Sequence, residues 1–129
     1  MKLLLDTHIW LCALGHPGRL DREILRLLDH PGNELLLSPI SIWEAGQLAR
    51  DGRIRVRPTF PQWLDMVLLR IRVQEAPLNF AVAAEAARIT LPQNDLGDRF
   101  LAATASVFNL TLVTEDPQLL ACKWLKTLP

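Results

Sequence analysis

Four acidic side chains stand where an apolar segment ends or a helical pattern begins. Asp6 closes KLLLD, Glu44 lies in SPISIWEAG, Asp98 begins DRFLAATA, and Asp116 ends LVTED. Converging carboxylates repel one another, and a hard divalent cation such as Mg²⁺ or Mn²⁺, which prefers oxygen ligands, relieves that repulsion. Water bound to such an ion has a lowered pKa and can attack a phosphodiester. If these acids meet in the fold, they predict metal-dependent phosphodiester chemistry.

Each acid also has a purely structural explanation. Asp6 can end a strand and cap the helix after it, and Asp116 before Pro117 is a common turn or N-cap pair. Asp95 and Asp98 fit a variant capping box at the head of one helix. Four acids at the same edge of one sheet are much rarer by chance than any one of them, so the metal hypothesis depends on the fold.

Short apolar segments alternate with helical patterns along the chain. We expect strands at 2–6, 34–38 and 110–114, a brief edge strand at 73–78 and a further one at 124–128. We expect helices at 7–14, 19–30, 41–51, 61–71, 79–89 and 94–105. This alternation predicts an α/β sandwich with a mostly parallel sheet. Ligands bind beyond the carboxyl ends of such strands, so all four acids are expected in one cleft there.

The composition suits one globular domain and leaves the class of partner open. The 129 residues are half hydrophobic, and 14 basic residues balance 14 acidic ones. A chain of this length buries a sufficient core as a single domain, 1–129. The arginines are concentrated between residues 50 and 72, and Arg50, Arg53, Arg55 and Arg57 form the densest part. That density fits either a phosphate-facing patch or an ordinary solvated face.

Several other classes of site and setting have no support in the sequence. The two cysteines, Cys12 and Cys122, lack metal-ligand spacing and indicate a reduced, intracellular protein. There is no His/Cys cluster for zinc, no P-loop and no glycine-rich dinucleotide turn. No apolar run approaches the roughly 20 residues that span a bilayer. Phosphotransfer on a strand-end aspartate is disfavoured because Asp6-Thr7-His8 has no second acid two residues on.

The segments LLLDTHIWL, SPISIWEAG, DRFLAATA and LVTED, in this order and spacing, resemble the PIN-domain family, and most closely its VapC-type toxins from bacterial toxin–antitoxin pairs. The resemblance covers nearly the whole chain. It implies a three-layer α/β/α sandwich with four to five strands, and an Mg²⁺- or Mn²⁺-dependent endoribonuclease in the cytoplasm. It also implies a cognate VapB-like antitoxin and a homodimer. An alternative is a catalytically inert PIN-like interaction module.

The resemblance assigns roles residue by residue. It makes Asp6, Glu44, Asp98 and Asp116 the catalytic, metal-binding quartet, and gives Thr114 the hydroxyl that supports the last acid. Separately from the resemblance, the density of Arg50, Arg53, Arg55 and Arg57 alone makes them candidate contacts for RNA or for a partner protein.

The chain departs from the family pattern just before its third acid. Related sequences often have Asp-Pro before the Asp-Arg pair, where this chain has Asp95-Leu96-Gly97. Asp95 is therefore expected to cap the helix or to hold water near the metal. Arg99 fits either a substrate phosphate or a surface ion pair and stays unassigned.

Four further residues near the acids are expected to have structural roles. Thr7 and Ser41 fit helix caps better than ligand contacts. Trp43 is expected in the core, as large aromatics at helical spacing usually are. His8 is expected to pack against its helix or to bond the backbone.

Overall fold

The central sheet is built from short segments that lie far apart in the sequence. The computed structural model describes residues 1–92 and 95–129. Within them a five-stranded sheet has the order β3-β2-β1-β4-β5, and every neighbouring pair is parallel. The strands are β1 (Lys2–Leu5), β2 (Glu34–Leu37), β3 (Gln74–Glu75), β4 (Thr111–Val113) and β5 (Thr127–Leu128).

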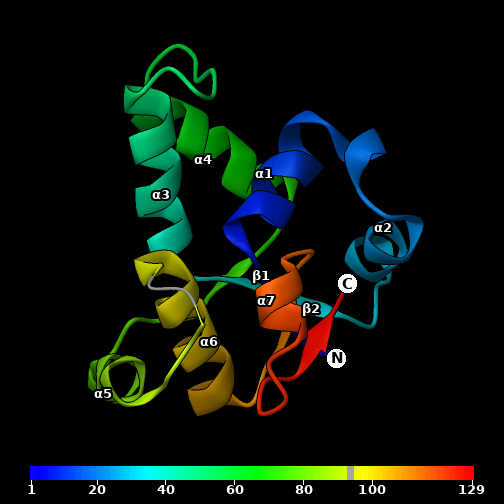
Figure 1. Ribbon diagram of the computed structural model, residues 1–129. Coiled ribbons are helices and arrows are strands. Elements are labelled where there is room, and N and C mark those ends of the chain that lie inside the picture. The colour runs from blue at the N-terminus through cyan, green and yellow to red at the C-terminus, as the bar shows by residue number, and fades with distance from the viewer. Residues whose placement is uncertain (93–94) are drawn as a thin grey trace.

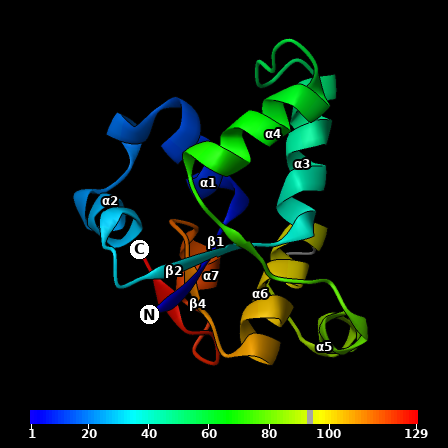
Figure 2. The ribbon, with the colours of Figure 1, turned by 180° about the vertical axis from the view of Figure 1, so that it is seen from behind.

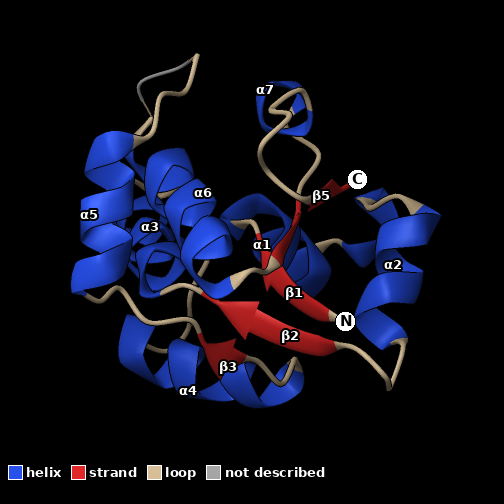
Figure 3. Ribbon diagram, turned by 90° about the horizontal axis from the view of Figure 1, so that it is seen from below, coloured by secondary structure: helices blue, strands red, loops and turns tan. Residues whose placement is uncertain are grey.

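Helices connect the strands and cover both faces of the sheet (Figures 1 and 3). They are α1 (Thr7–Gly15), the short 3-10 helix η1 (Pro17–Arg19), α2 (Arg22–Asp29), α3 (Pro39–Arg50), α4 (Phe60–Arg70), α5 (Phe80–Arg88), α6 (Leu96–Phe108) and α7 (Pro117–Leu120). Among the described residues, no helix is both long enough and apolar enough to cross a membrane.

The alternation of side chains along β1 divides the hydrophobic core in two. Leu3 and Leu5 pack on one face with residues of α1, α2 and α4, including Trp10 and Ile24. Leu4 points to the opposite face, in a cluster supplied mainly by α5, α6 and α7. All three leucines are fully buried, and each contributes on the order of 1.5–3 kcal/mol. The three-layer α/β/α sandwich with a parallel sheet is thereby confirmed.

The strand order places the topological switch point between β1 and β4. From β1 the chain moves outward to β2 and β3 on one side, and it later adds β4 and β5 on the other. The direction of winding therefore changes between β1 and β4, and ligands of open parallel sheets bind beyond the carboxyl ends of such strands. Asp6 and Thr114 are the first residues beyond these two ends.

Some element boundaries differ from those expected, for local reasons. Helix α3 begins at Pro39 instead of residue 41, because the Ser38 side chain accepts a 3.1 Å hydrogen bond from the Ile40 N–H and proline suits the first helical turn. The edge strand expected at 73–78 shortens to β3, and the last strand expected at 124–128 shortens to β5. The Asp116-Pro117 pair starts a short helix, α7, with Asp116 as its N-cap.

Candidate active site at the carboxyl edge of the sheet

Asp6 and Thr114 meet at the ends of the paired strands β1 and β4, although they are 108 positions apart in the sequence. Thr114 Oγ1 donates a 2.7 Å hydrogen bond to Asp6 Oδ2, and it accepts one of 3.0 Å from the backbone N–H of Asp116. Thr114 is fully buried and Asp6 is 9% exposed. The parallel pairing of β1 with β4, with the Asp6 N–H bonded to Val113 O at 3.0 Å, fixes this arrangement. The Thr114 hydroxyl thus supports the first acid by its side chain and the last acid through its backbone.

Glu44 is held by a chain of hydroxyl groups that runs from α3 to α1. Thr7 Oγ1 donates a 2.6 Å hydrogen bond to Glu44 Oε1, and Ser41 Oγ lies 2.7 Å from Thr7 Oγ1. Because the single Thr7 proton goes to Glu44, Ser41 must donate to Thr7. Both hydroxyls are buried. The capping role expected for both hydroxyls was wrong, since Asp6 is the N-cap of α1 and Ser38 is the N-cap of α3. The sequence signal was the i, i+3 spacing of Ser41 and Glu44 on one helix face.

The start of α6 brings Asp98 to the same edge. Asp95 is the N-cap, and its Oδ1 accepts a 3.1 Å hydrogen bond from the Asp98 N–H. That contact fulfils the capping alternative for Asp95. Gly97 lies against Glu44 so closely that a Cβ there would sit 2.8 Å from Glu44 Cδ. The glycine therefore allows the first turn of α6 to approach α3, a role that the sequence analysis missed.

The acids influence one another strongly at Asp98. The pKa of Asp98 is raised from 3.8 to about 7, first by burial and then by the carboxylates of Asp95, Asp6, Asp116 and Glu44. A carboxyl group with so high a pKa at a sheet edge is a functional-site candidate. The other three acids of the predicted quartet, and Asp95, therefore lie near enough to Asp98 to disfavour its charge.

Two other members of the cluster have pKa values displaced in the same direction. Burial raises the pKa of Asp6, against the lowering effect of the Thr114 hydrogen bond. Burial also raises the pKa of Glu44, against the hydrogen bond from Thr7. Each carboxylate therefore has an environment that disfavours its charge and one hydroxyl that stabilises it.

The donor chemistry fits a hydrated hard cation. The cluster offers carboxylate oxygens that repel one another, which is the environment in which Mg²⁺ or Mn²⁺ is stabilising. Within residues 1–92 and 95–129, no group of three or more His, Cys, Asp or Glu side chains is arranged to hold a metal ion. Mg²⁺ commonly uses one or two carboxylates and completes its shell with water and phosphate oxygens. The site therefore suits an ion of that kind better than a closed zinc cage.

Arg99 and Trp43 lie in environments that differ from those expected from the sequence. Arg99 Nη1 donates 2.7 Å hydrogen bonds to the carbonyls of Ala86 and Ile89, where α5 ends. It fastens α5 to α6, which is neither of the two roles considered. Trp43 was expected in the core, and that was wrong, because 56% of it is exposed. Its helix presents Ile40 inward instead.

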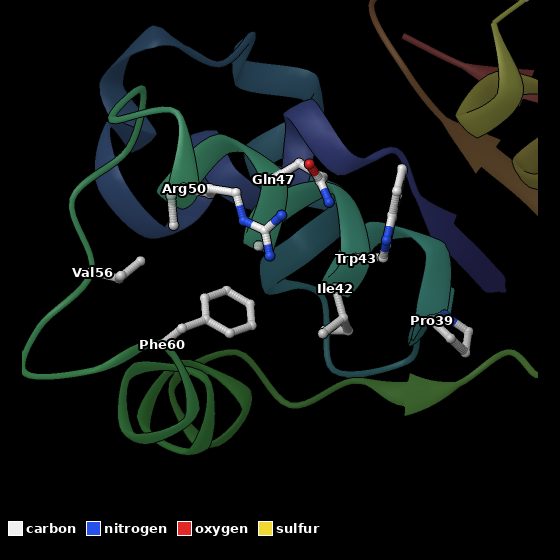
Figure 4. A pocket seen from close by; sticks show the side chains of 9 residues that line it. Pro39, Ile42, Trp43, Gln47, Arg50, Val56 and Phe60 are labelled. Carbon is white, nitrogen blue, oxygen red and sulfur yellow. The ribbon is translucent and has the colours of Figure 1, made fainter.

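The four candidate arginines are exposed, and they do not form one cluster. Arg50 lines a groove of about 820 Å³ on α3, together with Trp43 and Phe60 (Figure 4). Arg53 and Arg55 line a different cleft, and Arg57 lines neither. The sequence density of arginines is therefore divided over at least two surfaces.

Comparisons with known proteins agree with this architecture. The fold is similar to VapBC2 from Rickettsia felis, solved bound to a DNA fragment from the promoter, with a TM-score of 0.68, 18% identity and coverage of 99% of this chain and 98% of that chain. It is similar to VapBC-1 from nontypeable Haemophilus influenzae, with a TM-score of 0.65, 20% identity and coverage of 99% and 97%. A toxin–antitoxin complex from Klebsiella pneumoniae gives a TM-score of 0.69, 18% identity and coverage of 98% and 96%. The comparison with curated proteins gave no match.

The family assignment comes from the sequence model. The model of the PIN domain matches residues 3–124, which include all four acids and the Thr114 hydroxyl. The chain belongs to the PIN domain family.

Proposed function

We propose that this chain is an Mg²⁺- or Mn²⁺-dependent endoribonuclease and the toxin of a toxin–antitoxin pair. One observation carries the proposal: the carboxylates of Asp6, Glu44 and Asp116 all help to raise the pKa of Asp98, so the four acids act on one another. Membership of the PIN domain family and the similarity to VapBC and other toxin–antitoxin complexes support it.

The quartet would hold the cation. When bound, a divalent cation acidifies a water molecule and neutralises charge that develops on the phosphate. The chain itself orients the ligands. Thr114 occupies one oxygen of Asp6, and Thr7, backed by Ser41, occupies one oxygen of Glu44. Each hydroxyl fixes a side-chain rotamer, so the second carboxylate oxygen is presented in a defined direction.

Asp98 completes the arrangement from a separate element. Its backbone is fixed by the Asp95 cap, and the glycine before it lets α6 approach Glu44. The four acids therefore come from four different segments. Asp6 follows β1, Glu44 lies on α3 after β2, Asp116 follows β4, and Asp98 lies on α6. A substrate phosphate that binds between them meets ligands whose positions do not depend on one mobile loop.

A cognate antitoxin and a second copy of the chain are the expected protein partners. A carboxylate cluster is a natural docking site for an arginine or lysine, so we expect the antitoxin to mask the site with a basic side chain. A nuclease that cleaves cellular RNA is expected to act in the cytoplasm. Expression of the chain alone should then impair bacterial growth, and co-expression of its antitoxin should restore growth. Cleavage of RNA in vitro without any effect on growth would contradict the toxin role and leave the nuclease role intact.

The nuclease role is tested by incubating labelled RNA with the protein and Mg²⁺ or Mn²⁺, or with EDTA. Wild-type protein should cleave internal bonds only with metal, and Asp98→Asn should lose activity by orders of magnitude. Asp65→Asn is the matched control, because Asp65 is an exposed acid on α4. If wild-type protein cleaves nothing with either metal, the chain is an inert interaction module instead.

A further inference from the structure

A cleft with a basic rim lies beside the acids, between α1 and the segment that joins α3 to α4. It has a volume of about 980 Å³. Figures 1 and 2 show α1 beside α4, and the connection from α3 to α4 turns at the same end of the molecule. We call it the cationic cleft, after the basic residues that line it: His8, His16, Arg19, Arg53, Arg55 and Arg70.

A ligand entering the cationic cleft meets positive charge. The six basic residues are all exposed, whereas apolar lining residues such as Leu11, Trp63 and Val67 are partly or fully buried within the core. No carboxylate is found among the described residues that line the cleft. None of the ion pairs between described residues involves the four arginines of the cleft. This is the charge pattern of a site for an extended polyanion.

One lining residue of the cationic cleft lies next to the acid cluster along the chain. His8 lines the cleft and stands two residues after Asp6, in the first turn of α1. The same cleft is lined by Arg19, Arg53 and Arg55. From His8 to Gly15 it follows α1 for about 10 Å, at 1.5 Å per residue.

We infer that the cationic cleft binds the backbone phosphates of an RNA strand next to the bond that is cleaved. The inference rests on the proposed nuclease function and adds the path of the substrate. A cluster of carboxylates repels RNA, so the strand needs a compensating positive surface close by. Arginine side chains on both walls provide one, Arg19 from the α1 side and Arg53 and Arg55 from the α3–α4 connection.

The test compares two triple variants that remove the same number of charges. The cleft variant is Arg19→Gln/Arg53→Gln/Arg55→Gln, and the control variant is Arg22→Gln/Arg72→Gln/Lys123→Gln. The control residues are exposed and do not line the cleft. Fluorescence anisotropy with a short labelled single-stranded RNA, in EDTA to prevent cleavage, gives the dissociation constant over a range of salt concentrations. Thermal melts establish that both variants are folded.

The cleft variant should bind RNA roughly tenfold or more weakly at low salt, and the slope of log K against log salt should fall by roughly 2, about 0.7 for each phosphate that is no longer neutralised. The control variant should keep nearly the wild-type slope. Equal slopes in wild type and cleft variant would overturn the inference and leave a protein partner as the occupant. An equal weakening in both variants would overturn it too, since only net charge would matter. Cleavage of RNA by the wild-type protein, with and without metal, is measured in parallel. It tests the nuclease proposal independently of the result for the cleft.

Discussion

Gly97 at the start of α6 lies directly against the carboxylate of Glu44 on α3. A Cβ at position 97 would be 2.8 Å from Glu44 Cδ, although the two residues belong to helices that follow different strands. Thr7 holds the same carboxylate from the other side, through its 2.6 Å hydrogen bond. Glu44 is therefore confined between a hydroxyl of α1 and the backbone of α6.

Gly97→Ala should displace the Glu44 carboxylate. Moving the Glu44 carboxylate costs stability, whereas alanine favours a helix over glycine by up to about 1 kcal/mol. Because these two effects oppose each other, the free energy of unfolding without metal should change little. RNA cleavage and the stabilisation by Mn²⁺ should both fall, because one acid has moved. Gly46→Ala is the matched control, since its Cβ would meet Phe60 at 3.6 Å, an ordinary contact. If Gly97→Ala behaves as Gly46→Ala in both assays, the close approach has no functional importance.

Thr114→Val should destabilise the protein, because buried Asp6 loses the hydroxyl that donates to it. The expected loss in the free energy of unfolding is about 1–3 kcal/mol, measured by urea unfolding without metal. Thr114→Ser keeps the hydroxyl and should restore most of it. Thr104→Val is the control, because Thr104 is equally buried and its hydroxyl donates only to the Phe100 carbonyl one turn earlier. Equal losses in both valine variants would assign the effect to burial alone.

The raised pKa of Asp98 predicts a pH dependence of stability. The folded protein binds this proton more tightly than the unfolded chain does, since the pKa is about 7 against 3.8. The stability that Asp98 contributes is therefore fully present below about pH 4 and is lost as the pH rises to about 7. The advantage of Asp98→Asn over wild type should grow across that range and then level off. Urea unfolding in EDTA at several pH values measures it, and a constant difference would contradict the prediction.

The convergence of the acids followed from the sequence because it depends on strand order and direction. Asp6 and Asp116 lie just beyond two apolar segments, and parallel strands bring such positions to one edge. Asp98 and Glu44 were placed there because each lies in the first turns of a helix, although a carboxylate near a helix start also serves as a favourable charge for the helix dipole. The capping bond from the Asp98 N–H to Asp95 is local, so the sequence was sufficient to suggest it.

What the sequence did not reveal depends on contacts between distant segments. In the Ser41–Thr7–Glu44 chain of hydroxyl groups, the two hydrogen bonds join residues that are 34 and 37 positions apart in the sequence. Trp43 lies on a helix with apolar residues on several sides, so periodicity could not decide which side faces the core. The division of the arginines between two surfaces depends on how the segment after α3 folds back, and arginine density alone contains no such information.

Asp98 can act as a metal ligand or only as a favourable charge at the start of α6, and the variant Asp98→Asn distinguishes the two roles. If Asp98 only favours the start of α6, Asp98→Asn should change the response to metal little, because asparagine keeps the size of the side chain. If it shares a cation with Asp6, Glu44 and Asp116, removing one of the repelling charges should make the metal-free protein as stable as wild type or more so at neutral pH. Stabilisation by Mg²⁺ or Mn²⁺ should then shrink, by about 1.4 kcal/mol for each tenfold loss of affinity.

Thermal melts of wild type, Asp98→Asn and the control Asp65→Asn, each with and without metal, measure both effects. Asp65→Asn should keep the full metal-induced rise in melting temperature, because Asp65 is an exposed residue of α4 and is not among the carboxylates that raise the pKa of Asp98. Asp98→Asn should start from an equal or higher melting temperature and gain less. An equal gain in all three proteins, with RNA cleavage retained by Asp98→Asn, would remove Asp98 from the metal site.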